Sequence, residues 1–222
     1  MLLLTVATEN EIAPLKEELA ATPGVDLFVT GMGPVTAAAS LASYLGRCGG
    51  SIKGVLNIGV AGAYPGSGPT LLDLCLARQE VLGDFGICMT EGMRDFDPEI
   101  AGVAAPLLFD NGLVSRLKTI LQKNGTDFIE ANFVTVCCCS GTTERGRFLR
   151  DKFGAGCENM EGAAVALACS HFAIPCAELR CVSNMVEDRD TGKWQLAAAI
   201  EKICVATGVF VREYVAAAAS ST

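Results

Sequence analysis

The sequence predicts an α/β fold in three layers, in which a mixed but mostly parallel central sheet carries helices on both faces. Apolar runs of strand length alternate along the chain with segments of helical periodicity, and this alternation is typical of βα units. Half of the 222 residues are hydrophobic and only 19% are charged, which suits a sheet that is buried on both faces. Because no linker or internal repeat interrupts the chain, we expect residues 1–222 to form a single domain.

The first part of the chain begins with a strand, a polar turn and a helix. Leu2–Ala7 is a continuous apolar run, and apolar residues at helical spacing follow from Ile12 to Leu19. A further helix is expected from Pro34 to Leu45, because the fixed φ angle of proline suits the first turn of a helix. The other strands predicted here are Asp26–Thr30, Gly54–Ile58 and Leu71–Ala77.

Residues 78–110 are expected to be irregular, because glycine and proline recur in this segment among acidic and aromatic residues. A loop of that length in a compact domain is usually functional or lies against a partner. After it the alternation of helices and strands resumes. The predicted helices are Leu113–Lys123, Thr143–Lys152, Met160–Phe172 and Leu196–Ala217, and the predicted strands are Phe133–Cys139 and Cys176–Val182.

The charge of the chain argues against a nucleic-acid or membrane partner. The formal net charge is −8 at pH 7, and the lysines and arginines are scattered rather than gathered into a basic stripe. We therefore expect a small-molecule enzyme. The apolar stretch Met1–Val6 is too short for the apolar core of a signal peptide, and no uninterrupted apolar run reaches membrane-spanning length. The expected location is the cytoplasm.

The eleven cysteines have no spacing that indicates a specific chemistry. Their number is odd, no pair has the C-x-x-C spacing, and Cys137, Cys138 and Cys139 would point to alternate faces of a strand. The single histidine, His171, has no cluster of metal ligands around it in the sequence. We expect reduced cysteines in the core, no metal and no cofactor.

Two glycine-rich segments, Gly31–Gly33 and Gly59–Gly62, each come directly after a predicted strand. The first lacks the third glycine of a dinucleotide-binding fingerprint. Taken alone, either segment could equally well be a plain turn between two elements or part of a ligand-binding site. Both are expected at the carboxyl ends of consecutive strands, where open α/β sheets bind their ligands. Glu11 and Asn184 are expected to face the same crevice.

Five short motifs occur in the order and spacing of one enzyme family. They are Ala7–Glu11, Thr30–Gly33, Asn57–Gly62, Asn159–Glu161 and Val182–Asn184. On these motifs nearly the whole chain resembles the family of purine nucleoside phosphorylases and methylthioadenosine/S-adenosylhomocysteine nucleosidases. The resemblance implies a nucleoside phosphorylase-like fold, a small-molecule nucleoside substrate, and a homodimer or higher homo-oligomer with the 78–110 segment at or near an interface.

Two longer segments, Glu158–Ala164 and Val182–Trp194, resemble one branch of this family, the futalosine hydrolases. Members of that branch remove hypoxanthine from futalosine on an alternative route to menaquinone. The resemblance therefore implies hydrolysis of the N-glycosidic bond of a 6-oxopurine nucleoside, leaving dehypoxanthine futalosine. The residues that could hold the benzoate end of such a substrate are, by charge, Arg94, Arg145, Arg189 and Lys193.

The resemblance also assigns roles to two carboxylates. Glu11 is the expected base that deprotonates a water at the anomeric carbon, and Glu161 is expected to accept from both ribose hydroxyls beside the backbone of Met160. Ala61 and Gly62 are expected to contact the substrate. Such an arrangement fits a bond that breaks through a positively charged, oxocarbenium-like sugar. From the residues alone, Glu11 and Glu161 could instead be structural carboxylates that are stabilised at the first turn of a helix.

Asn184 stands where most nucleosidases of the family have Asp, and it indicates a 6-oxopurine. Its NH₂ group can donate to O6 of hypoxanthine while its carbonyl accepts from N7–H, whereas a protonated Asp matches adenine. A mismatched pair would bury an unpaired polar group at a cost of about 1–3 kcal/mol. Because Asn184 is no acid at neutral pH, the N7 proton is expected to come through water. Further contacts to the base are expected from the backbone around Ser140–Thr143.

Water is the expected nucleophile rather than phosphate. The resemblance places a phosphate-binding arginine of the phosphorylases where this chain has Asn57. The alternatives are an adenine-releasing methylthioadenosine/S-adenosylhomocysteine nucleosidase, a purine nucleoside phosphorylase, and a non-catalytic nucleoside-binding protein. Asn184 argues against the first and Asn57 against the second. A pair of carboxylates at Glu11 and Glu161 argues against the third, because a binding protein needs no water-activating base.

Overall fold

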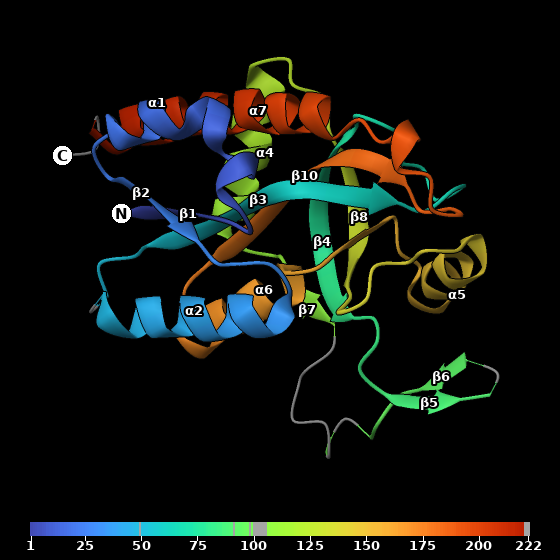
Figure 1. Cartoon of the computed structure of the whole chain (residues 1–222). Coiled ribbons are helices and arrows are strands. Elements are labelled where there is room, and N and C mark those ends of the chain that lie inside the picture. The colour runs from blue at the N-terminus through green and yellow to red at the C-terminus, as the bar shows by residue number, and fades with distance from the viewer. Residues whose placement is uncertain (49, 91, 98, 100–105, 220–222) are drawn as a thin grey trace.

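A mixed sheet of eight strands crosses the centre of the molecule, with helices on both of its faces (Figure 1). The computed structural model describes residues 1–48, 50–90, 92–97, 99 and 106–219. The strands of the sheet are β1 (Leu2–Val6), β2 (Val25–Val29), β3 (Gly54–Ala63), β4 (Leu74–Leu82), β7 (Leu107–Leu108), β8 (Ile129–Thr135), β9 (Cys157–Asn159) and β10 (Cys176–Met185). A separate hairpin consists of β5 (Ile87–Met89) and β6 (Gly92–Arg94).

The helices form the two outer layers. In Figure 1, α1, α4 and α7 lie above the sheet, α2 and α6 lie below it, and α5 packs beside β8. Their bounds are Lys16–Ala20 for α1, Pro34–Arg47 for α2, Gly112–Lys123 for α4, Thr143–Phe153 for α5, Gly162–His171 for α6 and Leu196–Ala219 for α7. Short 3₁₀ helices cover Glu9–Glu11 (η1), Ala13–Leu15 (η2) and Thr191–Lys193 (η3). The predicted α/β class, with a mixed sheet between helices, is confirmed.

The core lies between these layers. Every residue of β1 is buried, because a strand that is covered on both faces has no side open to water. Burying one such leucine, for example Leu3, stabilises the fold by about 1.5–3 kcal/mol relative to leaving it exposed. Helix α6 is apolar around most of its circumference, and it is accordingly enclosed between α2 and the sheet.

Part of the sheet closes on itself. Strand β3 pairs with β10 on one side and with β9 on the other, and the order β10–β4–β8–β9 completes the ring. β1 and β2 extend the sheet beyond β3 as parallel neighbours. Closure needs long, strongly curved strands, and β10 has an irregularity in its register between Val182 and Asn184 that helps it to curve.

Strands β3, β4 and β10 run further than the sequence predicts. β3 continues to Ala63 and β10 to Met185, so Gly59–Gly62 is part of a strand and its interpretation as a turn is wrong. Gly59 serves a different purpose. A Cβ atom there would come within 2.7 Å of Glu11 Oε1, so the missing side chain leaves room for the carboxylate.

Three further expectations need correction. The predicted helix from Ile12 to Leu19 is broken into 3₁₀ turns and a short α1, because Pro14 cannot continue an α-helix. The segment 78–110 is partly regular, since β4 extends to Leu82 and the β5–β6 hairpin follows; residues 91, 98 and 100–105 of it lie outside the described residues. The predicted strand Phe133–Cys139 is Ile129–Thr135 instead.

Ten of the eleven cysteines divide into two groups, and Cys48 is half-buried. Cys75, Cys157, Cys169, Cys176, Cys181 and Cys204 are buried, as expected for small core residues. Because β8 ends at Thr135, Cys137–Cys139 lie in the following loop with exposed side chains, and Cys88 is exposed as well. The expectation that these four belong to the core is therefore wrong. Within the described part of the chain, no helix combines the length and apolar character needed to cross a bilayer.

Candidate active site

A cavity of about 310 Å³ opens at the carboxyl ends of the parallel strands β1, β3 and β10. The fold therefore places it where α/β sheets bind ligands. The residues that the sequence predicts as catalytic or in contact with the base and ribose line this cavity: Glu11, Ala61, Gly62, Met160, Glu161 and Asn184. Its volume is in the range of small-molecule sites.

Glu11 lies on η1, directly after β1, and is only 8% exposed. Its Oε2 atom accepts from the backbone N and the Oγ1 of Thr8, at 3.0 and 3.1 Å. Its Oε1 atom accepts from the backbone N of Val60 at 3.2 Å. Both interpretations of Glu11 thus fit the geometry, because the carboxylate caps a short helix and also faces the cavity.

Glu161 is the N-cap residue of α6, and its carboxylate is held from two sides. Oε1 accepts from the backbone N of Gly33 at 3.0 Å, which explains the close approach of the Gly31–Gly33 turn. Oε2 lies 3.4 Å from Nη2 of Arg180. Met160, the preceding residue, also lines the cavity.

Arg180 is a residue of the site that the sequence reasoning missed. Its side chain is 2% exposed, and its Nε lies 2.7 Å from Oε1 of Glu178, two residues earlier on the same face of β10. Nη1 donates to the carbonyl of Val60 at 3.1 Å. Burial lowers the pKa of Arg180, but the carboxylates of Glu178, Glu161 and Glu11 outweigh that effect and raise it. The sequence does contain a signal for this pair, because Glu178 and Arg180 are two charged residues at i and i+2 within an otherwise apolar run of β10.

We call Glu11, Glu161 and Arg180, which line the cavity, together with Glu178, which pairs with Arg180, the floor of the cavity. Beneath it lies Glu80 of β4, which is fully buried and accepts hydrogen bonds from Asn159 Nδ2 and, at 2.9 Å, from Thr135 Oγ1. Burial raises the pKa of Glu80 well above its ordinary value, and the nearby carboxylate of Glu178 raises it further. The pKa of Glu178 is raised by burial too, although Arg180 opposes the rise. The pair therefore retains a proton at pH values where a free carboxyl group has lost it.

Two residues join Glu80 and Glu178 to the start of α6. A Cβ atom on Gly162 would overlap carboxylate oxygens of both Glu80 and Glu178, so only glycine fits there. Asn159 Oδ1 accepts from the backbone N atoms of Glu161 and Gly162, at 2.9 and 2.7 Å, and from Nη2 of Arg180 at 3.3 Å. Asn159 thus fixes the helix end that carries Glu161.

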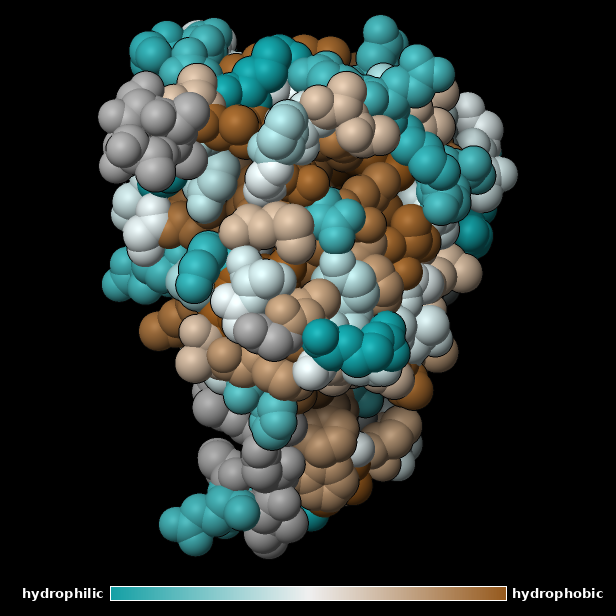
Figure 2. Space-filling view, turned by 90° about the vertical axis from the view of Figure 1, so that its left-hand side faces the viewer, coloured by the Kyte–Doolittle hydropathy of each residue, from teal (hydrophilic) through white to brown (hydrophobic). Residues whose placement is uncertain are grey.

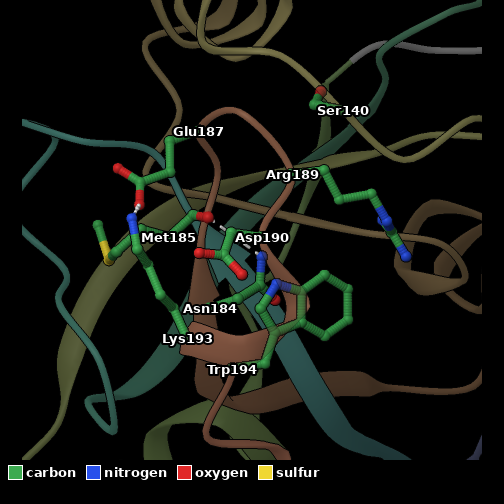
Figure 3. A pocket seen from close by; sticks show the side chains of 8 residues that line it. All are labelled: Ser140, Asn184, Met185, Glu187, Arg189, Asp190, Lys193 and Trp194. Atoms are coloured by element: carbon green, nitrogen blue, oxygen red, sulfur yellow. Dashed lines mark hydrogen bonds and ion pairs between the residues drawn. The ribbon is translucent and has the colours of Figure 1, made fainter.

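Asn184 lies near the end of β10, beyond the register shift that follows Val182, and faces Gly62 of β3. Its Oδ1 atom lies 3.0 Å from the hydroxyl of Ser183, and its Nδ2 donates to the carbonyl of Met185 at 3.3 Å (Figure 3). An amide nitrogen has two hydrogens, so one N–H of Asn184 is left for a ligand. Ala61, whose carbonyl lies 3.3 Å from Ser183 Oγ, completes this wall.

Of the segment Ser140–Thr143, the structure brings only Ser140 to the cavity. Its backbone N donates to Glu158 Oε1 at 2.9 Å, and the other oxygen of Glu158 accepts from Tyr64 at 3.1 Å. Burial, followed by the charge of Glu158, raises the pKa of the Tyr64 hydroxyl. The residues that follow Ser140 in this segment do not line the cavity, and the contact of the segment with a base stays a prediction.

The four cations proposed for a benzoate end lie in different places. Arg94 is on the separate β5–β6 hairpin and does not line the cavity. Arg145 is 3.4 Å from Asp84, and Lys193 is 3.5 Å from Glu187. Arg189 alone among these four lines the cavity, with its guanidinium 4.8 Å from the centre of the Trp194 ring.

The site thus combines an acidic floor, an amide wall and a cationic outer edge. A carboxylate beside the cavity can take a proton from water, and a second can accept from hydroxyl groups of a bound sugar. Among the described residues, no His, Cys, Asp and Glu side chains gather in an arrangement that would hold a metal ion.

Comparison with known proteins shows the family of the chain. A sequence model of the phosphorylase superfamily matches residues 19–216. Futalosine hydrolase of Thermus thermophilus is 35% identical over 179 residues, which cover 78% of this chain and 75% of that protein. Futalosine hydrolase of Streptomyces coelicolor is 29% identical over 189 residues, covering 83% and 77%. Aminodeoxyfutalosine nucleosidase of Helicobacter pylori is 30% identical over 141 residues, covering 62% and 58%.

Solved structures share the fold at lower identity. A futalosine hydrolase mutant of Helicobacter pylori superposes with a TM-score of 0.82 at 22% identity, covering 96% of this chain and 98% of the other. The methylthioadenosine/S-adenosylhomocysteine nucleosidase of the same organism, in complex with a substituted pyrrolidinol, superposes with a TM-score of 0.83 at 22% identity, covering 96% of this chain and 97% of the other. The chain therefore belongs to the phosphorylase superfamily and, within it, to the family of the futalosine hydrolases.

Proposed function

We propose that this nucleoside N-glycosidase hydrolyses futalosine to hypoxanthine and dehypoxanthine futalosine, a step of menaquinone biosynthesis. One observation carries the proposal: the amide of Asn184 shares a cavity with the carboxylates of Glu11 and Glu161. The amide suits a 6-oxopurine, and the carboxylates suit a sugar that becomes positively charged as the glycosidic bond breaks.

Glu11 acts as the base that activates water. Among the described residues, Oε1 of Glu11 accepts one hydrogen bond, from Val60 N, so it can also accept from a water molecule in the cavity. Glu161 binds the ribose hydroxyls beside Met160. Arg180 and Gly33 orient the Glu161 carboxylate. Ala61 and Gly62 support the substrate from β3.

Asn184 selects the base. Its free N–H donates to O6, and its carbonyl accepts from N7–H once Ser183 Oγ turns its hydrogen toward the carbonyl of Ala61. The N7 proton comes through water, because Asn184 has no acidic proton to give. An adenine-releasing nucleosidase is the second candidate, since Helicobacter pylori nucleosidases of that type share the fold. The amide at position 184 favours the 6-oxopurine.

Water, and not phosphate, is the nucleophile. Asn57 lies in the buried network, where Nδ2 donates to Glu178 at 3.2 Å and Oδ1 accepts from Thr5 at 3.0 Å, so it offers nothing to a phosphate. Arg180 is engaged by two carboxylates and the Val60 carbonyl. A phosphate dianion near these carboxylates would lack a free guanidinium partner.

The chain works as a single domain, without cofactor or nucleic acid, in the cytoplasm and as a homodimer or higher homo-oligomer. Support for assembly comes from the segment around the β5–β6 hairpin, where Phe85, Met89 and Phe96 are exposed and the two phenylalanine rings lie 5.4 Å apart. Figure 2 shows apolar side chains gathered on this lower, projecting part of the molecule. Exposed apolar patches of this kind mark contact surfaces.

Incubation with futalosine in phosphate-free buffer tests the proposed reaction. We expect stoichiometric release of hypoxanthine, detected by chromatography, and no increase in rate when phosphate is added. A rate that depends on phosphate would identify a phosphorylase. Release of base from methylthioadenosine but not from futalosine would identify an adenine-releasing nucleosidase.

A further inference from the structure

The segment 187–195, which follows β10 and which we call the outer segment, forms the open edge of the cavity. It contributes Arg189 and Trp194 to the main cavity and also to a smaller hollow of about 20 Å³ beside it. Ser140 and Asn184 line both spaces as well. The two hollows therefore share a wall, and a ligand that reaches Asn184 lies next to the outer segment.

Arg189 differs from its cationic neighbours in having no acidic partner. Lys193, four residues later, pairs with Glu187. Among the described residues, no carboxylate lies within ion-pair distance of the Arg189 guanidinium, which lies 4.8 Å from the centre of the Trp194 ring. Figure 3 shows that Arg189 extends away from the Glu187–Lys193 pair, on the side of the indole. An exposed guanidinium held this way keeps its N–H donors for a ligand.

The distribution of charge over the cavity indicates that a substrate group bound near Arg189 is negatively charged. The floor has three carboxylates around one guanidinium, so an anionic group would be repelled there. The unpaired cation lies at the other end, on the outer segment. This arrangement suits a substrate whose sugar becomes positively charged in the transition state, beside the carboxylates of the floor, and whose other end carries a negative charge, beside Arg189.

We propose that Arg189, held over Trp194, forms a subsite for a carboxylate on the arm of the substrate that extends beyond the ribose. This inference rests on the proposed function, because futalosine carries such an aromatic carboxylate. The guanidinium pairs with the carboxylate through charge-assisted hydrogen bonds, and the exposed edge of the indole offers an apolar surface to the aromatic ring. Arg189 is thus a specificity-determining residue and takes no part in cleaving the bond.

The test compares futalosine with its methyl ester, which keeps the base, the sugar and the arm but loses the negative charge. Wild-type protein should prefer the acid by about ten- to a hundredfold in kcat/KM, the range of one charge-assisted hydrogen bond. Arg189→Ala should abolish that preference by slowing only the acid. It should leave inosine, which lacks the arm, unchanged. Lys193→Ala is the matched control, a cation of the same segment that already has a partner, and it should leave the preference intact.

Two further variants separate the parts of the subsite. Arg189→Lys keeps the charge but not the planar fork, so it should retain only part of the preference for the acid. Trp194→Ala should reduce the preference because the guanidinium loses the ring that holds it. Equal losses for the acid, the ester and inosine in Arg189→Ala would overturn the subsite, as would no loss at all. Failure of the proposed function gives a different result, in which wild-type protein cleaves inosine or methylthioadenosine but not futalosine.

Discussion

Two arginines of this protein line the same cavity in opposite environments. Arg180 of the floor is 2% exposed and contacts Glu178, Glu161, Asn159 and the Val60 carbonyl. Arg189 of the outer segment is exposed, rests on Trp194 and has no carboxylate partner in the described part of the chain. A buried guanidinium has to be neutralised by the protein itself, whereas an exposed one can remain available. We therefore infer that Arg180 fixes the structure of the site, whereas Arg189 can bind a group of the substrate.

The same comparison separates residues that we expect to act in catalysis, on the floor, from Arg189, which we expect to determine specificity. Removing a floor residue should affect every nucleoside, because we propose that the reacting sugar and the water bind beside the floor. Removing Arg189 should affect only substrates with an anionic arm. The following variants test this division, beginning with the largest expected effect.

Glu11→Gln should reduce kcat by about 10²–10⁴-fold for futalosine and for inosine alike, the usual effect of losing a general base. The amide keeps the shape of the side chain, so thermal unfolding should show a folded protein that still binds hypoxanthine. Steady-state kinetics with both substrates measures the effect. If kcat stays at the wild-type value, Glu11 is only the cap of η1.

Arg180→Ala should lower the free energy of unfolding by about 3–5 kcal/mol, because it leaves Glu178 and Glu161 buried without their counter-charge. Arg189→Ala should change it by less than about 0.5 kcal/mol, as expected for an exposed side chain. Urea unfolding of the two variants side by side gives the comparison. Similar losses of stability in both would contradict the distinction between floor and outer segment.

Glu80→Gln should change how stability depends on pH. Burial raises the folded-state pKa of Glu80 above the ordinary 4.5, so its proton stabilises the fold at low pH and that contribution is lost as pH rises toward the folded-state value. Above pH 4.5 the wild type should therefore lose stability relative to the variant, by about 1.4 kcal/mol per pH unit within that window. Parallel stability curves for the two proteins would show that Glu80 is ionised in the fold.

The sequence predicted the parts of the site that depend on local motifs. Glu11, Glu161 and Asn184 each follow or precede a strand in a short recognisable segment, and the structure brings all three to one cavity. The α/β class followed from the alternation of apolar runs and helical patterns. The class needs only neighbouring residues, whereas the roles of Glu11, Glu161 and Asn184 came from the resemblance of their motifs to one family; the rule that parallel strands end at the same edge explains why these motifs meet.

The contact between Glu178 of the floor and Glu80 beneath it could not be predicted in the same way. Glu80 belongs to β4 and Glu178 to β10, and their contact depends on the closure of the sheet, which a single sequence does not encode in any local pattern. Closure was missed because Gly59 and Gly62 resemble turn residues. In the structure they lie within a long strand, where Gly59 makes room for Glu11.

The substrate preference of the wild type and of Asn184→Asp tests the central claim most directly. The measurement is the ratio of kcat/KM for futalosine to that for methylthioadenosine, in phosphate-free buffer. We expect the wild type to prefer futalosine strongly. Asn184→Asp should shift the ratio toward the 6-aminopurine by about ten- to a hundredfold, because one exchanged hydrogen-bond pattern is worth roughly 1–3 kcal/mol. A wild type that prefers methylthioadenosine, or a ratio that the substitution leaves unchanged, would contradict the role of Asn184 in selecting hypoxanthine.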